Sequence, residues 1–176
     1  MTPDGVRVPA VKTDKVYLVG FMGAGKTTVA RALARRLGWR YADVDEMIER
    51  RERQTVADVF AKQGEAYFRA AERAVLLEQV ATRHLVVATG GGTFVDPQNR
   101  AVINSDGLSV WLDVPLERLI ARVPVDGRRP LAADRTAFEQ LYVARRTSYG
   151  EAHVHIDAGR ASIPGIVEQV LDTLGS

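Results

Sequence analysis

The sequence has no cysteine among its 176 residues. Disulfide bonds, thiolate metal sites and cysteine nucleophiles are therefore excluded as explanations of its function. It also lacks an apolar run long enough to cross a membrane. Residues 1–14 lack the apolar centre of a signal peptide. We therefore expect a flexible leader over residues 1–14 and a cytoplasmic location.

An excess of either charge is missing as well, because 24 Lys and Arg residues face 22 Asp and Glu residues, a net charge of +2. Such a balance does not indicate a nucleic-acid surface. The three histidines, His84, His153 and His155, do not have the spacing of metal ligands. We expect small-molecule partners, without nucleic acid or membrane, and a monomer, since no long apolar seam is evident.

The most informative stretch is an apolar segment followed by the pattern G-x-x-x-x-G-K-T from Gly20 to Thr27, and then an amphipathic helix. In this phosphate-binding loop (P-loop), glycines let successive N–H groups face a phosphate chain, and the helix N-terminus adds its positive dipole. Lys26 is placed to reach the β- and γ-phosphates and Thr27 to bind Mg²⁺. The predicted nucleotide-binding residues here are Gly23, Ala24, Gly25, Lys26, Thr27 and Thr28.

Strand-like and helix-like segments alternate along the chain, which predicts one α/β domain over residues 15–176 with parallel strands. The predicted strands are 15–19, 39–43, 85–89, 108–113 and 153–157. The predicted helices are 26–37, 45–51, 55–62, 65–82, a short one opened by Asp96 and Pro97, 115–122, 137–149 and 164–174. Within 65–82, Ala70, Ala74, Leu77 and Ala81 are expected to share one side.

Acidic residues follow the second predicted strand, at the edge where parallel α/β sheets bind ligands. If the strand continues through Asp43 and Asp45, both carboxylates point the same way. One could orient waters on Mg²⁺ and the other could accept a proton from an attacking hydroxyl. Alternatively, Asp45 caps a helix and Asp43 is a solvated acid. Asp113, at the end of the fourth strand, is a rival metal partner.

Two further segments suggest an acceptor site. Arg69 could clamp a carboxylate, with Glu72 on the same helix face to hold it; the alternative is a surface ion pair. Gly90-Gly91-Gly92 follows an apolar strand and would let a ligand approach the backbone; the alternative is a plain flexible turn.

Arginines also mark two later segments. The Pro-, Gly- and Arg-rich stretch at about 123–136 predicts a mobile lid that brings an arginine to the phosphates, either Arg128 or Arg129. The neighbours Arg145 and Arg146 lie on a predicted helix, so at most one of them faces the cleft. We favour Arg145, because Tyr149 is its i, i+4 neighbour.

In order and spacing, these motifs together resemble the shikimate kinase family, within the nucleoside monophosphate kinase-like P-loop group, over about residues 16–174. The resemblance implies a three-layer P-loop kinase fold with a five-stranded parallel sheet in the order 2-3-1-4-5, helices on both faces and a mobile lid. It also implies that ATP, with Mg²⁺, phosphorylates the 3-hydroxyl of shikimate in the biosynthesis of chorismate and aromatic amino acids.

On the acceptor side, the resemblance implies that Asp45 engages the substrate hydroxyls and acts as base. It places shikimate against Arg69, Gly91, Gly92 and Arg145, with the two arginines on the carboxylate.

On the nucleotide side, the resemblance makes Lys26 a catalytic phosphate ligand and Thr27 a metal ligand. Asp43 would contact Mg²⁺ through water. The implied adenine and lid positions are Arg122, Arg160 and the catalytic Arg129.

This sequence departs from the family at Thr147-Ser148, where Pro-Leu is usual before the tyrosine. The doubled arginines leave Arg128 or Arg129, and Arg145 or Arg146, open. A kinase of gluconate or another polyol acid is the rival within kinases. A GTPase switch would show an Asn/Thr-Lys-x-Asp motif after the P-loop, and none is present. An inactive nucleotide binder would be expected to lose Lys26 or Asp45.

Overall fold

The computed structural model describes residues 12–122 and 135–175. The strands are β1 (Lys15–Val19), β2 (Arg40–Asp43), β3 (Leu85–Ala88), β4 (Leu108–Asp113) and β5 (Val154–Asp157). The helices are α1 (Lys26–Leu37), α2 (Val44–Glu52), α3 (Val56–Gln63), α4 (Glu65–Gln79), η1 (Thr93–Val95, 3₁₀), α5 (Pro97–Asp106), α6 (Leu116–Arg122), α7 (Arg135–Tyr149) and α8 (Ile163–Leu174). The predicted segments are confirmed to within a few residues, and the predicted lid lies almost wholly outside the described residues.

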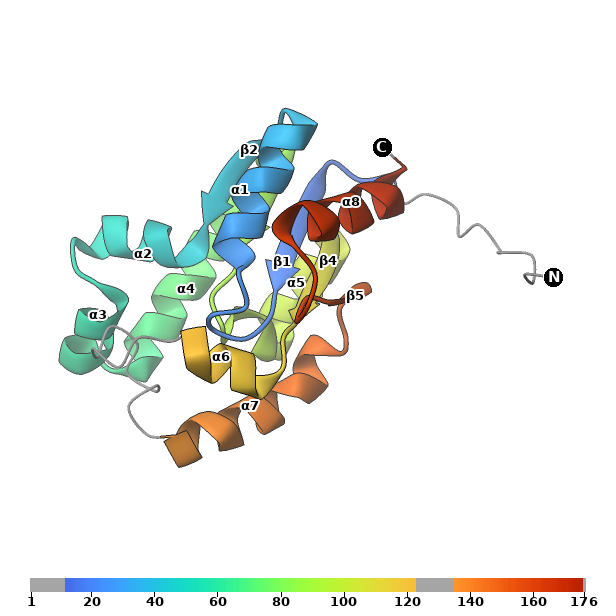
Figure 1. The fold of residues 1–176 in the computed structure, drawn as a ribbon. Helices are drawn as coiled ribbons and strands as arrows, with labels where there is room; N and C mark the ends of the chain where they lie inside the picture. The colour runs from blue at the N-terminus through green and yellow to red at the C-terminus, as the bar shows by residue number, and fades with distance from the viewer. Residues whose placement is uncertain (1–11, 123–134, 176) are drawn as a thin grey trace.

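The five strands form one parallel sheet in the order β2-β3-β1-β4-β5, as predicted. Leu18 pairs with Ala88 on one side and Val110 on the other, which places β1 at the centre. All residues of β1 and β3 are buried, as expected for parallel strands covered on both faces. In Figure 1, α1 and α8 lie side by side in front of the sheet and α5 lies behind it.

Helices α2, α6 and α7 gather near the carboxyl ends of the strands, where the P-loop also lies (Figure 1). This arrangement brings segments that are distant in sequence to one edge of the sheet. Within residues 12–122 and 135–175, no helix has the length and apolar character needed to span a membrane.

Helix α1 is delimited by glycines at both ends. Gly25 has φ 94° and Gly38 has φ 68°, in the left-handed region that glycine adopts without strain. Between them, Val29, Ala30, Leu33 and Ala34 are buried, so the apolar stripe predicted by helical spacing faces the sheet.

Helix α2 begins differently from the prediction. Asp43 ends β2 and caps the helix, since its Oδ1 accepts a hydrogen bond from the Glu46 N–H at 3.0 Å. Asp45 therefore lies in the first helical turn and not on an extended strand. The expectation that strand alternation aligns the two carboxylates is wrong, and so is the alternative that Asp45 is the cap.

Helix α4 buries the opposite side from the alanine-rich one. Ala70, Ala74 and Leu77 are exposed, and Ala81 lies beyond the helix end. The buried residues are Phe68, Ala71, Glu72, Val75 and Leu76. Larger apolar side chains decide the orientation, because burying them removes more apolar area from water than burying alanine.

The amino ends of the strands carry a buried ion-pair network. Lys15 is fully buried, and its Nζ lies 2.7 Å from Asp106 Oδ2 and donates to the carbonyl of Gln79 at 2.5 Å. The Tyr17 hydroxyl donates to the same Asp106 oxygen at 2.6 Å. The buried polar groups of Lys15 and Tyr17 therefore both have partners, as low dielectric surroundings require.

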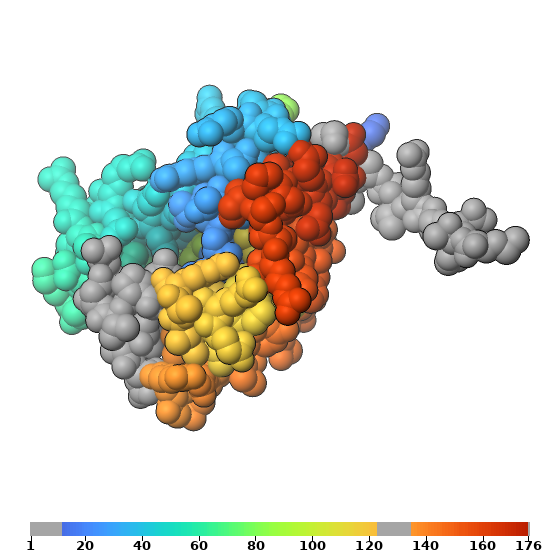
Figure 2. Space-filling model, viewed as in Figure 1, coloured from blue at the N-terminus to red at the C-terminus, as the bar shows by residue number. Residues whose placement is uncertain are grey.

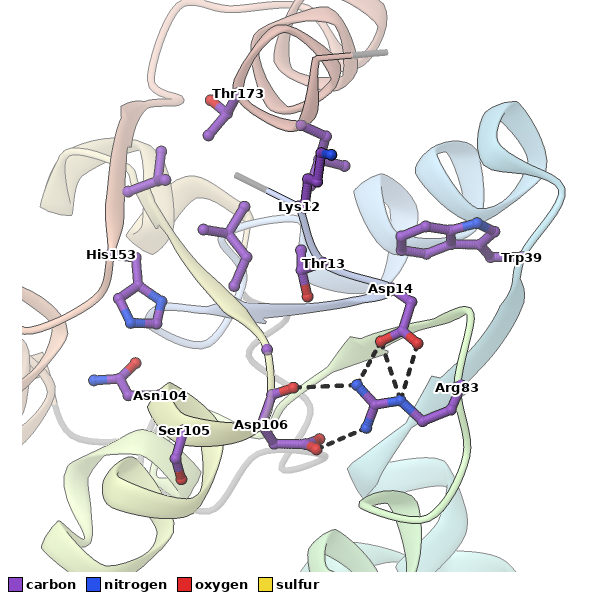
Figure 3. Close-up of a pocket in the computed structure, with 14 residues that line it drawn as sticks. Lys12, Thr13, Asp14, Trp39, Arg83, Asn104, Ser105, Asp106, His153 and Thr173 are labelled. Atoms are coloured by element: carbon purple, nitrogen blue, oxygen red, sulfur yellow. Dashed lines mark hydrogen bonds and ion pairs between the residues drawn. The ribbon is translucent and has the colours of Figure 1, made fainter. Parts of the chain in front are cut away.

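Figure 3 shows the open cavity beside this network, with a volume of about 1000 Å³. Arg83 lies in its wall and bonds to both Asp14 and Asp106, which fastens the end of the predicted leader to the fold. The Asp14 carbonyl also accepts a hydrogen bond from Leu85 N–H at 3.1 Å. Asp14 is therefore part of the folded domain, in contrast to its assignment to a loose leader.

We expect Asp106→Ala to lower the free energy of unfolding by about 3–5 kcal/mol, because it leaves the Lys15 ammonium buried without a counter-ion. Urea unfolding followed by circular dichroism measures the change. Glu168→Ala removes the partner of Arg36 in an exposed pair and should cost no more than about 1 kcal/mol. Equal costs for the two variants would contradict this account of the network.

The Asp106 carboxylate also makes the stability of the fold depend on pH. Desolvation alone would raise the pKa of Asp106, but hydrogen bonds from Lys15, Tyr17 and Arg83 outweigh it and lower the pKa. A lowered pKa in the folded state gives stability that is complete above the unfolded value of about 4 and is lost as pH falls through the folded value. Asp106→Ala should therefore flatten the acid limb of the stability profile.

Candidate active site

The P-loop joins β1 to α1 and wraps around the Lys26 side chain. Lys26 Nζ donates to the carbonyls of Gly20 at 2.5 Å and Phe21 at 3.0 Å, and the residue is only 8% exposed. The amine is thus held within the curl of the loop, beside the N-terminus of a 12-residue helix. This is the arrangement that binds phosphate oxygens.

A hydroxyl and a carboxylate meet at the first turn of α1. Thr27 Oγ1 donates to Asp43 Oδ2 at 2.7 Å, and Asp43 is buried. Two hard oxygen donors beside a phosphate-binding loop suit Mg²⁺, which keeps several waters and needs few protein ligands. Among the residues that the structure describes, there is no group of three or more His, Cys, Asp or Glu that could hold a metal ion.

Three side chains from three helices converge on the loop after β3, one at each glycine. A Cβ at Gly90 would lie 2.8 Å from Asp45 Oδ1, and one at Gly91 would lie 3.2 Å from Arg145 Nη1. At Gly92 a Cβ would lie 2.6 Å from Arg69 Nη2. The absence of side chains here therefore makes room for a carboxylate and two guanidinium groups.

Arg69 is held in place by the buried carboxylate of Glu72. Its Nη1 donates to Glu72 Oε1 at 3.0 Å, and Glu72 is fully buried. The Thr93 hydroxyl donates to Glu72 Oε2 at 2.9 Å and accepts from the Gly90 N–H at 2.9 Å. The pair is therefore not the surface ion pair considered as an alternative. Thr93 was not singled out from the sequence, although this residue directly follows the three glycines.

Arg145 reaches the same loop from α7. It is 7% exposed, and its guanidinium lies over the Phe21 ring at 5.7 Å. Burial lowers the pKa of Arg145, the nearby Tyr149 opposes that shift and the positive Arg69 adds to it. The Tyr149 hydroxyl donates to the Gly91 carbonyl at 2.5 Å. Two cations thus lie beside the same loop, which favours an anionic ligand.

The neighbouring Arg146 points elsewhere. Its guanidinium binds Asp113 through two bonds, of 2.7 and 3.1 Å. The geometry therefore favours Arg145 over Arg146 as the clamp. The geometry also favours Asp43 over Asp113 as the metal partner, because Asp43 is the carboxylate that bonds to Thr27.

Helix α6 borders the P-loop on its other side. Arg122 Nη1 donates to the Gly23 carbonyl at 3.3 Å, and Arg118 donates to the Gly159 carbonyl in the segment after β5. Figure 2 shows α6 beside the segment that leads into α8, below the start of α1. Arg160 is exposed in that segment. Arg118 was not singled out from the sequence, although it lies one helical turn before Arg122.

Three further predicted positions can be placed. Ala24 is buried in the P-loop, while Thr28 is exposed on α1. The lid residues Arg128 and Arg129 lie outside the described residues.

Comparison with known proteins shows the family. The shikimate kinase family model matches residues 22–175. A shikimate kinase of Aromatoleum aromaticum is 44% identical over 88% of this chain and 91% of its own. One of Persephonella marina is 38% identical over 89% of this chain and 96% of its own.

Solved structures agree in fold. A shikimate kinase from Acinetobacter baumannii in complex with shikimate has a TM-score of 0.86 at 37% identity, covering 90% of this chain and 91% of that one. A sugar kinase from Janibacter at 18% identity, with a TM-score of 0.61, shows only that the fold is shared. The chain belongs to the shikimate kinase family.

Proposed function

We propose that this protein transfers the γ-phosphoryl group of ATP to the 3-hydroxyl of shikimate, giving shikimate 3-phosphate and ADP. This is the reaction of a small-molecule kinase in chorismate and aromatic amino-acid biosynthesis. The observation that carries the proposal is the convergence of Arg69 and Arg145 on a side-chain-free loop that also receives Asp45, at the sheet edge that holds the P-loop. Similarity to shikimate kinases over most of the chain supports it.

The two arginines suit the shikimate carboxylate. A guanidinium presents its donors in a planar fork that matches a carboxylate, and burial strengthens the interaction. Glu72 neutralises and orients Arg69, whereas Arg145 is buried near a second cation. An incoming carboxylate would relieve that repulsion. The shikimate ring would then lie along Gly91 and Gly92, where no side chain obstructs it.

The P-loop would hold the nucleotide. Its backbone N–H groups and Lys26 would bind the phosphates of ATP, and Thr27 with Asp43 would hold Mg²⁺. Mg²⁺ held there would supply positive charge that neutralises the charge developing on the phosphates. Arg122 and Arg160 would border the adenine, and Arg129 would reach the phosphates from the lid.

Asp45 is the residue we assign to the acceptor hydroxyl. It would orient the hydroxyl for in-line attack on the γ-phosphorus and accept its proton as the new P–O bond forms and the bond to ADP breaks. Transfer through a loose transition state needs mainly positioning and charge stabilisation. Closing the site would exclude water and so suppress hydrolysis of ATP. We further propose a cytoplasmic monomer.

The first experiment is a coupled assay of ADP release with ATP and Mg²⁺, comparing shikimate, gluconate and no acceptor. We expect stimulation by shikimate alone. Stimulation by gluconate alone would reassign the acceptor, and ATP binding with no stimulation by either would refute the proposed reaction.

We expect Lys26→Met and Asp45→Asn each to lower kcat by about a hundredfold or more, since each removes a group that acts on the transferring phosphoryl or its acceptor. Circular dichroism and thermal unfolding should show an intact fold. Near-wild-type turnover in a folded variant would remove the role given to that residue.

Gly92→Ala should raise the KM for shikimate by about tenfold, equal to about 1.4 kcal/mol. The backbone at Gly92, with φ −101° and ψ −7°, accepts alanine, but the new methyl group would displace the Arg69 guanidinium. Steady-state kinetics measures the change, and the KM for ATP should stay constant.

Gly150→Ala is the matched control, because a Cβ there makes only ordinary contacts, the nearest at 3.4 Å. An unchanged KM for shikimate in Gly92→Ala would mean that Arg69 does not bind the acceptor.

A further inference from the structure

A cluster of charged and aromatic side chains lies beside the proposed acceptor site and outside the machinery described above. It consists of Trp111 and Asp113 on β4, Arg146 on α7 and His155 on β5, and we call it the Asp113 cluster. Arg146 binds both oxygens of Asp113, at 2.7 and 3.1 Å. His155 Nε2 lies 2.9 Å from Asp113 Oδ2. One carboxylate thus joins three elements of the fold.

Trp111 packs within this cluster. The His155 ring stacks on the indole with centroids 4.3 Å apart and planes at 17°, and the Arg146 guanidinium lies 4.9 Å from the indole centroid. Trp111 also contacts Tyr149, with ring centroids 5.9 Å apart. A Cβ at Gly20 would lie 3.5 Å from Trp111 Cδ1. The indole therefore lies beside Gly20 of the P-loop and contacts Tyr149, whose hydroxyl binds the Gly91 carbonyl.

Helix α7 is tied to the end of β4 by a second bond. Arg146 Nη1 donates to the Tyr142 hydroxyl at 2.8 Å, and that hydroxyl donates to the Val114 carbonyl at 3.1 Å. These bonds fix the rotation of the helix about its own axis. Arg145 is the preceding residue of the helix, so its direction depends on where Arg146 is held.

The charges of Asp113 and Arg146 also hold Arg146 away from the acceptor site. Desolvation raises the pKa of Asp113, but the bonds from Arg146 and His155 outweigh it and lower the pKa. Asp113 is thus an anion that pairs with the guanidinium of Arg146. Without Asp113, Arg146 would lack its anionic partner and could compete with Arg145 for the carboxylate of a ligand.

We propose that Asp113 and Arg146 are positioning residues for the acceptor site: their ion pair, packed on Trp111, sets helix α7 so that Arg145 and Tyr149 meet the loop at Gly91. This inference rests on the proposed function, because it assigns the acceptor carboxylate to Arg145. Neither residue of the pair touches the reacting atoms. Its loss should therefore weaken acceptor binding and leave the phosphoryl-transfer step largely intact.

The test is a double-mutant cycle with Asp113→Asn, Arg146→Gln and the double variant. Each single variant should raise the KM for shikimate by about tenfold, with kcat and the KM for ATP changed by less than about twofold. The double variant should be no worse than either single one, because both remove the same ion pair. Titration calorimetry with shikimate should show the same loss of affinity without relying on turnover.

The matched control lies on the same helix. Arg135 and Glu139 form an exposed pair at 3.1 Å near the start of α7, and Glu139→Gln should leave the KM for shikimate unchanged. Arg146→Lys keeps the charge but not the planar fork, so it should show an intermediate rise. It also carries the test if Asp113→Asn does not fold, as judged by thermal unfolding.

The outcomes separate this inference from the proposed function. Wild-type protein that does not phosphorylate shikimate would remove the proposed function. Active wild-type protein with an unchanged shikimate KM in folded Arg146→Gln and Arg146→Lys would overturn the positioning role alone. Additive effects in the double variant, or a loss confined to kcat, would do the same.

Discussion

The acceptor half of this protein depends on the space left by three consecutive glycines. Because residues 90–92 have no side chains, Asp45, Arg69 and Arg145 can each approach the backbone there from a different helix. Larger residues would occupy the volume that these groups and a ligand need. The buried Glu72 then decides how Arg69 lies, and the Tyr149 hydroxyl fixes the Gly91 carbonyl. The convergence is thus a consequence of steric freedom at one short loop.

The parallel sheet explains why this loop stands next to the P-loop. All five strands end at the same edge, and β1 and β3 are direct neighbours in the sheet. The segments that follow them, the P-loop and the glycine loop, are therefore brought together although they are about 70 residues apart. Phosphoryl transfer needs donor and acceptor in contact and in line, and neighbouring strand ends supply that proximity without any flexible linker.

Charged networks lie at the amino ends and at the carboxyl ends of the strands, and the two networks have different roles. At the amino ends, the cations Lys15 and Arg83 are compensated by Asp106 and Asp14, which suits a role in stability. At the carboxyl ends, Arg145 is buried with a repelling cation nearby and receives less compensation from the protein. Incomplete compensation of a buried charge is costly in the free protein and favours binding of an anion.

Much of this could be predicted from the sequence, because it depends on local patterns. The P-loop and the helix ends at Gly38 and Asp96 follow from short motifs. The strand order was implied by the family resemblance and is confirmed. Asp45 was also predicted to face the cleft, but for the wrong local reason, since Asp43 caps α2 and places Asp45 in its first turn.

Only the tertiary structure decided which of several similar residues faces the site. Adjacent arginines have the same chemistry, so Arg145, which the sequence only favoured, was separated from Arg146 when β4 supplied a carboxylate for Arg146. The buried side of α4 was likewise settled by packing of Phe68 and Leu76. The sequence by itself determined which chemical groups are present and the local backbone that carries them. Their directions depend on partners distant in the chain, which no short pattern contains.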